Sequence, residues 1–170
     1  MNMKKRFSTE KKTDYYLIYT LAFGIIGLIL YLQFYLNGKL LIWSHDGVPQ
    51  HLNSLAYYGE YLRNILHSVF VEHKFEIPMW DMHIGYGSDI LTTLHYYVIG
   101  DPLTLLSVFV SPEKTEYLYA FLIFLRIYLA GIAFSRYCFY HRNSKQAVLL
   151  GSLIYIFAGW TIYAAMKHPY

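Results

Sequence analysis

The sequence predicts an all-α, polytopic membrane protein with three transmembrane helices and a helical extracytoplasmic first loop. Its 170 residues are 56% apolar and only 15% charged, whereas a typical soluble domain has about 25% charged residues. The aromatic content of 19% excludes a disordered chain, because disordered chains are poor in aromatic residues. The net charge of +3 is too small to indicate a nucleic-acid partner. The single cysteine, Cys138, excludes an intramolecular disulfide.

Three apolar stretches are long enough to cross a bilayer, which requires about 20 residues. We predict transmembrane helices at 15–36, 117–140 and 147–165, and the second carries Arg126 near its middle. A cleaved signal peptide is the alternative interpretation of the first stretch. That stretch is longer than the apolar core of a signal peptide, and residues 37–39 offer no cleavage site of small residues. We therefore expect a retained membrane anchor.

The distribution of basic residues predicts the orientation in the membrane. The leader, residues 1–14, holds five Lys and Arg residues, and the link at 141–146 is also basic. The loop at 37–116 has only four basic residues against nine acidic ones. The positive-inside rule therefore places the leader and the link in the cytoplasm and the loop outside. Because the chain stops at 166–170, just after the third span, we expect the N-terminal piece of a longer protein.

Apolar residues in the first part of the loop follow helical spacing. From Leu52 to Phe70 they recur at i, i+3 and i+4, which predicts an amphipathic helix that begins near Pro49. A second helix is predicted over 89–99, with Ser88 as its N-cap.

Two Pro-containing signals follow in the second part of the loop. Asp101-Pro102 predicts the start of a short helix that ends at Val110, and Ser111-Pro112 predicts the start of the second span. The loop is therefore expected to form a helical layer at the membrane, which could carry a reaction site.

The segment 44–51 concentrates polar groups just after the first span. It holds Asp46 between His45 and Gly47, with a second imidazole at His51. One interpretation is structural, because an Asp-Gly pair is typical of a turn in which the carboxylate accepts hydrogen bonds from nearby backbone amides. The other is functional, with Asp46 as a general base or a clamp for substrate.

A second concentration of polar residues and glycines covers residues 77–89. Gly85 and Gly87 precede the predicted second helix and could hold an anion on backbone N–H groups. The segment lacks the preceding strand and third glycine of a dinucleotide fingerprint, and a turn that caps the helix is the alternative. Asp81 and His83 are too few for a metal prediction, and the histidines lack zinc-site spacing.

Arg126 and a tyrosine pair also allow two interpretations each. A guanidinium near the middle of the bilayer costs about 2.5–3.5 kcal/mol on insertion scales. Arg126 should therefore face a protein partner, or contact an anionic lipid headgroup or a phosphate. Tyr96 and Tyr97 are explained by an interfacial aromatic belt, and stacking on a sugar is the alternative.

Taken in order, the motifs of this chain resemble a known family. They are residues 44–51, 77–81, 84–89, 96–102 and 167–170. This order resembles the N-terminal part of the YfhO-like bacterial membrane proteins, within the GT-C glycosyltransferase superfamily. The resemblance covers nearly the whole chain from about residue 15, although family members continue through many more spans.

The resemblance implies a GT-C-like fold and an activity. GT-C enzymes take sugar from a polyprenyl-phosphate-linked donor on the outer face of the membrane, and YfhO-like proteins have been linked to decorating teichoic acids or other envelope polymers. The implied partners are membrane lipid, a polyprenyl-phosphate-linked sugar and an envelope polymer. The piece alone is expected to be inactive. A transporter or flippase, or a non-catalytic envelope assembly protein, is the alternative. A transporter should show broken helices with polar groups at mid-membrane, whereas the predicted spans are uninterrupted.

The resemblance also assigns roles to residues. The catalytic carboxylate of GT-C enzymes typically lies just after the first span, where Asp46 stands. Asp81 and Asp89 are candidates to bind sugar hydroxyls or a divalent cation, and no other cofactor is predicted. The full set of expected substrate-binding residues is His45, Gln50, His51, Trp80, Asp81, Gly85, Gly87, Ser88, Asp89, Tyr96, Tyr97, Asp101, Arg126 and His168.

Overall fold

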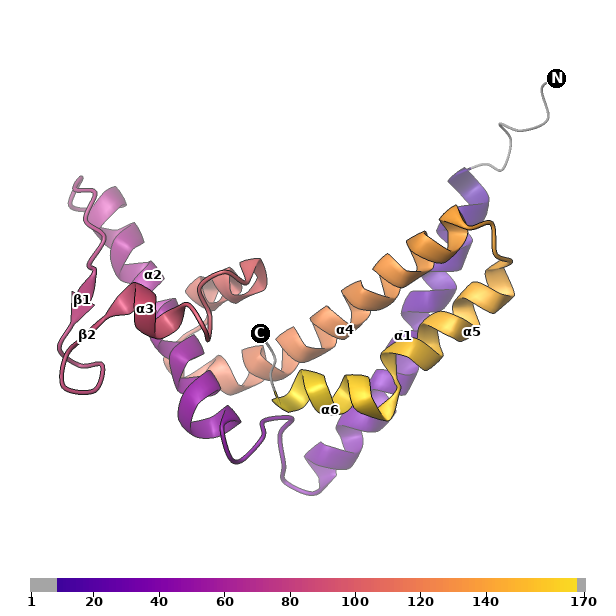
Figure 1. Ribbon diagram of the computed structural model, residues 1–170, viewed down its shortest axis with the longest axis horizontal. Helices are drawn as coiled ribbons and strands as arrows, with labels where there is room; N and C mark the ends of the chain where they lie inside the picture. Colours follow the sequence, from indigo (N-terminus) through magenta and orange to yellow (C-terminus); the bar gives the residue numbers. More distant parts are fainter. Residues whose placement is uncertain (1–8, 168–170) are drawn as a thin grey trace. The chain divides into compact units, whose positions relative to one another are not determined.

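The computed structural model describes the backbone of residues 9–167 and the side chains of residues 14–167. Most of the leader and the predicted site residue His168 therefore lie outside the described residues. The chain forms two compact units (Figure 1). The span unit contains the described residues up to Lys39 together with Phe124–Tyr163. The loop unit contains Leu40–Ile123 and the described residues from Ala164 onward.

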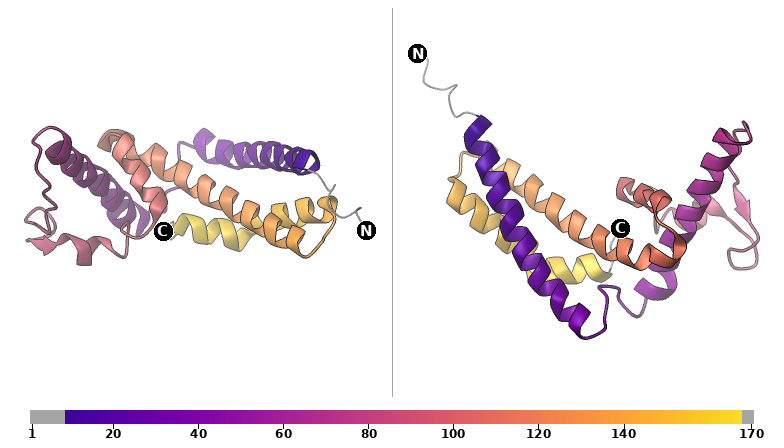
Figure 2. Two further views of the ribbon diagram at one scale, coloured as in Figure 1. Left: turned by 90° about the horizontal axis from the view of Figure 1, so that it is seen from above. Right: turned by 180° about the vertical axis from the view of Figure 1, so that it is seen from behind.

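Two helices are long and apolar enough to cross a membrane. Helix α1 covers Thr9–Leu36, with its apolar span at Asp14–Leu36. Helix α4 covers Thr115–Tyr140 and, with the short helix before it, forms the apolar span Pro112–Tyr140. Both lie where the sequence predicts transmembrane helices. Figure 2 shows α1 running alongside the later part of α4 and α5.

The third apolar stretch is not one continuous helix. It forms α5 at Lys145–Ile156 and α6 at Gly159–Lys167, bent by 46° at the break. Together they count as one broken span or a re-entrant loop. Gly159 weakens the helix at this point, because glycine has low helix propensity. The Thr161 hydroxyl donates to the Tyr155 carbonyl at 2.8 Å, which satisfies a carbonyl near the break without water.

A buried group of hydroxyls joins α1, α4 and α5 in the span unit. The Tyr15 hydroxyl lies 2.8 Å from the Ser135 hydroxyl, which lies 2.8 Å from that of Ser152. Small residues allow helices in a membrane to approach closely, and hydroxyls link them. Gly131 in α4 has this role, because a Cβ there would collide with the Tyr19 hydroxyl. Arg126, the charged residue predicted near the middle of the second span, is half-buried in the span unit.

The loop unit begins with the predicted amphipathic helix. Its first turn is a π-helix, η1, at Gly47–Leu52, and α2 continues over Asn53–Phe70. The predicted apolar face is buried at Leu55 and Gly59, whereas Leu66 and Phe70 near the end of α2 are exposed and Tyr58, which is not on that face, is buried.

The rest of the loop unit is shorter and less regular than the sequence predicts. A hairpin of two-residue strands, β1 at Trp80–Asp81 and β2 at Ser88–Asp89, was not expected. Helix α3 covers only Ile90–Leu94, not 89–99. It stops because the amides of Tyr97, Val98 and Ile99 all donate to the Leu94 carbonyl. The helical hydrogen-bond ladder therefore cannot continue.

The last loop elements pack against α2. The 3₁₀-helices η2 at Pro102–Phe109 and η3 at Pro112–Lys114 begin at the two predicted Pro signals. Arg63 of α2 donates to the carbonyls of Ser107 at 3.0 Å and Val110 at 2.7 Å. This guanidinium satisfies carbonyls at the C-terminal end of η2, so α2 and η2 are joined by charge-assisted bonds as well as packing.

Candidate functional site

A cavity of about 360 Å³ lies in the loop unit, between the start of α2, the hairpin turn and α3. We call it the α3 cavity. Its volume falls in the range of small-molecule sites, which starts near 300 Å³. The residues that line it are Pro49, Gln50, Asn53, Ser54, Tyr57, Ile84, Gly85, Thr93, Leu94 and Tyr97. Three of the predicted site residues, Gln50, Gly85 and Tyr97, therefore meet in one cavity.

Asp46 is connected to this cavity through one side chain. The Gln50 amide donates to Asp46 Oδ1 at 3.3 Å, and the Tyr97 hydroxyl donates to Gln50 Oε1 at 3.0 Å. Gln50 and Tyr97 line the cavity, whereas Asp46 stands behind Gln50 and is half-buried. The Asp46 side chain does not cap η1. Its carboxylate is therefore available to a group that reaches Gln50.

The two histidines beside Asp46 differ in their surroundings. His51 is 1% exposed, and its ring lies edge-on to Tyr97 with ring centroids 5.4 Å apart. His51 therefore supports Tyr97 in the cavity wall. His45 is exposed and its ring contacts Trp43 with centroids 5.2 Å apart. Sequence reasoning treated the two imidazoles alike, but only His51 contacts a residue of the cavity.

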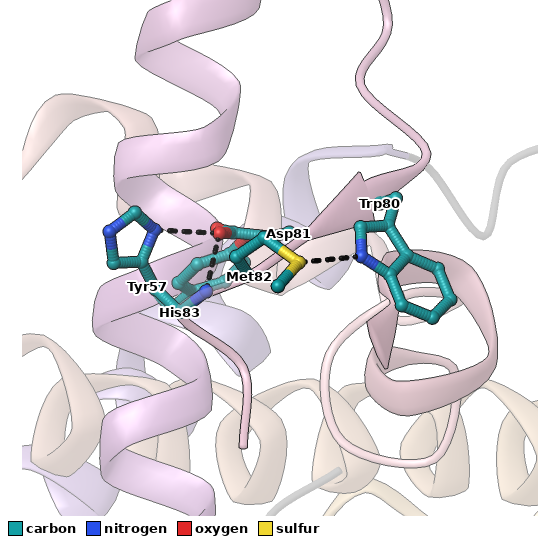
Figure 3. A network of polar contacts seen from close by, with 5 residues as sticks. All are labelled: Tyr57, Trp80, Asp81, Met82 and His83. Atoms are coloured by element: carbon teal, nitrogen blue, oxygen red, sulfur yellow. Dashed lines mark hydrogen bonds and ion pairs between the residues drawn. The ribbon is translucent and has the colours of Figure 1, made fainter. Parts of the chain in front are cut away.

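The Asp81 carboxylate links the hairpin to α2 by a hydrogen bond (Figure 3). The Tyr57 hydroxyl donates to Asp81 Oδ2 at 2.6 Å, and Oδ1 accepts the His83 backbone N–H at 2.8 Å. The His83 ring also lies 2.8 Å from Oδ1. Hydrogen bonds from Tyr57 and then from His83 lower the pKa of Asp81 to about 2. Burial, followed by the hydrogen bond to Asp81, raises the pKa of Tyr57.

A second cavity, of about 430 Å³, shares Tyr57 with the α3 cavity. Trp80, Asp81 and His83 line the second cavity, whereas Ile84 and Gly85 line the α3 cavity. Gly85 and Gly87 both have positive φ, at 61° and 104°, which favours glycine. At Gly87 a Cβ would also crowd the Trp80 ring. These glycines shape the turn, which favours the structural interpretation of this motif.

The hairpin attachment gives a testable pH dependence. Because the pKa of Asp81 is lower in the folded protein than its usual 3.8, the stabilisation is complete above pH 3.8 and is lost as pH falls through about 2. We expect Trp80 fluorescence, in a protein with Trp43→Phe and Trp160→Phe, to stay constant from pH 7 to 4 and to change toward pH 2. Asp81→Asn should remove this transition. A transition above pH 5 that needs Asp81 would contradict the prediction.

Three other predicted site residues have local partners. The Asp89 carboxylate caps α3 by accepting the Thr92 N–H at 2.7 Å, and Asp101 caps η2 by accepting the Leu103 N–H at 2.8 Å. The Ser88 hydroxyl lies 2.7 Å from that of Thr93. The N-cap of α3 is therefore Asp89 and not the predicted Ser88, and both carboxylates have the structural role of a helix cap. Within residues 14–167, no group of three or more His, Cys, Asp or Glu side chains could hold a metal ion.

Tyr96 and Arg126 are placed differently. Tyr96 is exposed and packs edge-on against Tyr97, with centroids 5.1 Å apart. Arg126 belongs to the span unit, whereas the α3 cavity belongs to the loop unit. Its role toward phosphate stays a prediction.

Sequence reasoning missed several residues of the cavity wall. Asn53, Ser54 and Tyr57 line the cavity together with Gln50. These positions follow the spacing i, i+3, i+4 and i+7, so they form a polar stripe on one helix face. This polar spacing is present in the sequence, but our prediction for this helix considered only its apolar face.

Comparison with known proteins identifies one related family. The sequence model of a family described as bacterial membrane protein YfhO matches residues 18–168. Nothing among the curated proteins or the solved structures matches this chain. The family match covers nearly the whole chain and confirms the resemblance seen in its motifs.

Proposed function

The chain belongs to the YfhO family of bacterial membrane proteins, and from that premise we propose that it takes part in extracytoplasmic sugar transfer. In this proposal a sugar moves from a polyprenyl-phosphate donor to a hydroxyl of an envelope polymer such as a teichoic acid. The site is the α3 cavity, and Asp46 is the catalytic base.

The proposed reaction balances without a further reactant. The acceptor hydroxyl oxygen attacks the anomeric carbon, and a new carbon–oxygen bond forms. The bond from that carbon to the phosphate oxygen breaks, and polyprenyl phosphate leaves with the electron pair. Asp46 accepts the hydroxyl proton, as a general base does. The leaving phosphate is stabilised either by Arg126 or by a cation from a further part of the complete protein.

One observation carries the proposal: the Asp46 carboxylate is hydrogen-bonded to a side chain of a polar cavity. The Gln50 amide links Asp46 to the cavity wall at 3.3 Å, and hydroxyl and amide groups line that wall. Such groups bind sugar hydroxyls by hydrogen bonds, and tyrosine rings add apolar surface. Asp46 also follows α1 by only ten residues, which keeps it near the membrane that holds a lipid-linked donor.

A transporter or flippase is the second candidate, because the third apolar stretch is broken. Transporters often bind substrate at discontinuous helices, and the break between α5 and α6 has that character. This break weakens the sequence argument against a transporter, which was that the spans are uninterrupted. Against a transporter, the buried hydroxyls of Tyr15, Ser135 and Ser152 bond to one another and not to a substrate.

Reconstitution separates the two candidate functions. The complete protein in proteoliposomes would receive a radiolabelled polyprenyl-phosphate sugar and teichoic acid on the outer side. Transfer of label to the polymer supports the glycosyltransferase. Movement of labelled lipid between leaflets without any transfer would instead identify a flippase and refute the proposal.

The proposed orientation also has a direct test. We expect Lys74→Cys, in the loop, to react with a membrane-impermeant thiol reagent on intact cells, and Asn143→Cys, in the link, to react only after lysis. Both positions are exposed in the structure, and both variants need Cys138→Ser as background. The expectation follows from the excess of basic residues in the leader and link. Labelling of Asn143→Cys but not Lys74→Cys on intact cells would reverse the topology.

A further inference from the structure

The wall of the α3 cavity has polar groups but no formal charge. Six of its ten lining residues have polar side chains, and none of the ten is Lys, Arg, His, Asp or Glu. The polar six are Gln50, Asn53, Ser54, Tyr57, Thr93 and Tyr97. The others are apolar or glycine.

The charges bonded directly to this wall are both negative. Asp46 accepts from Gln50, and Asp81 accepts from Tyr57. Each carboxylate therefore lies one side chain behind the cavity surface. No cation among the lining residues offsets them, so an anionic group inside the cavity would meet an unfavourable field.

The hydrogen-bonding capacity of the wall suits neutral hydroxyls. The Asn53 amide nitrogen donates to the Pro49 carbonyl at 3.1 Å, which leaves its oxygen as an acceptor toward a ligand. Within the described part of the chain, the Ser54 hydroxyl forms no hydrogen bond and can donate or accept. Gln50 is held at both ends, by Asp46 and by Tyr97, so its orientation is fixed before a ligand arrives.

We propose that the α3 cavity selects an uncharged sugar ring and rejects rings that carry a carboxylate or phosphate. The inference rests on the proposed function, since it names the class of sugar that the same site takes. The cavity of about 360 Å³ lies at the small end of ligand sites, which fits one ring better than an oligosaccharide. The phosphate of the lipid carrier then stays outside the cavity.

Binding of free monosaccharides tests this selectivity. Saturation-transfer NMR on the complete protein in nanodiscs would compare glucose with glucuronate as probes. We expect glucose to bind at least about tenfold more tightly than glucuronate, because the carboxylates of Asp46 and Asp81 repel that of glucuronate and no lining cation pairs with it. Binding of glucuronate as tight as that of glucose, or tighter, would overturn the proposal.

A pair of matched variants locates the effect. Asn53 and Asn64 are both exposed on α2, but Asn53 lines the α3 cavity and Asn64 lines the second cavity. Asn53→Lys adds a cation to the neutral wall and should shift the preference toward glucuronate by about tenfold. Asn64→Lys should leave the preference for glucose unchanged. An equal shift in both variants, or none in Asn53→Lys, would contradict the proposal.

This test is independent of sugar transfer. It needs no lipid donor, so a protein that binds neutral sugars as expected but transfers none refutes only the proposed function. A protein that transfers a uronic acid from a lipid donor would overturn only the selectivity. Transfer without binding of either monosaccharide would likewise remove the α3 cavity as the sugar site while leaving the transfer activity in place.

Discussion

Asp46→Asn is expected to lower the rate of sugar transfer by about 10²-fold or more, because general-base catalysis contributes about that factor. The substitution preserves the size of the side chain and an oxygen that can accept from Gln50, which lies 3.3 Å from Asp46 Oδ1. An amide cannot take the proton of the acceptor hydroxyl at neutral pH. The loss should therefore appear in the rate, with folding and membrane insertion unchanged. The measurement is incorporation of labelled sugar into envelope polymer by cells with matched amounts of each variant in the membrane.

Two other carboxylates provide matched controls for Asp46. Asp89→Asn and Asp81→Asn should reduce transfer less, because Asp89 caps α3 and Asp81 holds the hairpin. An Asn at position 89 still accepts the Thr92 N–H, so its effect should be small. Wild-type transfer in Asp46→Asn together with abolished transfer in Asp81→Asn or Asp89→Asn would move the catalytic role to the hairpin.

Gly59→Ala is expected to destabilise the loop unit by about 1–3 kcal/mol, the usual cost of overpacking a core. A Cβ at this position would lie 2.6 Å from the Ser107 carbonyl oxygen and 3.1 Å from its carbonyl carbon. These are backbone atoms of η2, so relief requires the helix to move. Alanine normally favours a helix interior over glycine by about 1 kcal/mol, so a measured loss would reveal the close contact. Thermal unfolding of the purified protein in detergent would report it.

Gly24→Ala is the matched control for this contact. Gly24 also lies inside a helix, in α1, and nothing lies within 4 Å of the position of an added Cβ. The control should be neutral or slightly stabilising. If Gly59→Ala were as stable as this control, the packing of α2 against η2 would be looser than the structure indicates.

Several features of this protein could be predicted from the sequence because they depend on neighbouring residues. Hydropathy over about 20 residues identifies α1 and α4 as spans, since the thickness of the bilayer sets that length. The apolar spacing from Leu52 to Phe70 predicts the helix α2 and identifies Leu55 and Gly59 as part of its buried face. The Asp101-Pro102 pair predicts the start of η2, because both the cap and the fixed proline φ act within one turn. The motif order indicates the family.

Other features depend on side chains that are distant in the sequence. Gln50 meets Tyr97 across 47 residues, and Tyr57 meets Asp81 across 24. Nothing in the local pattern of either segment specifies these pairs, because they form only after the hairpin and α3 pack against α2. The hairpin itself has strands of two residues, too short for an alternating pattern to be detected.

The sequence by itself therefore determined the class of protein, its family, its long apolar helices and the position of Asp46 just after the first of them. Only the tertiary structure decided that Asp46 is hydrogen-bonded to the wall of a neutral cavity and that Asp81 holds the hairpin. The physical reason is the distance along the sequence over which each interaction acts. Hydropathy and capping act within a helix turn or a span, whereas a cavity is defined by side chains that tertiary packing brings together from separate segments.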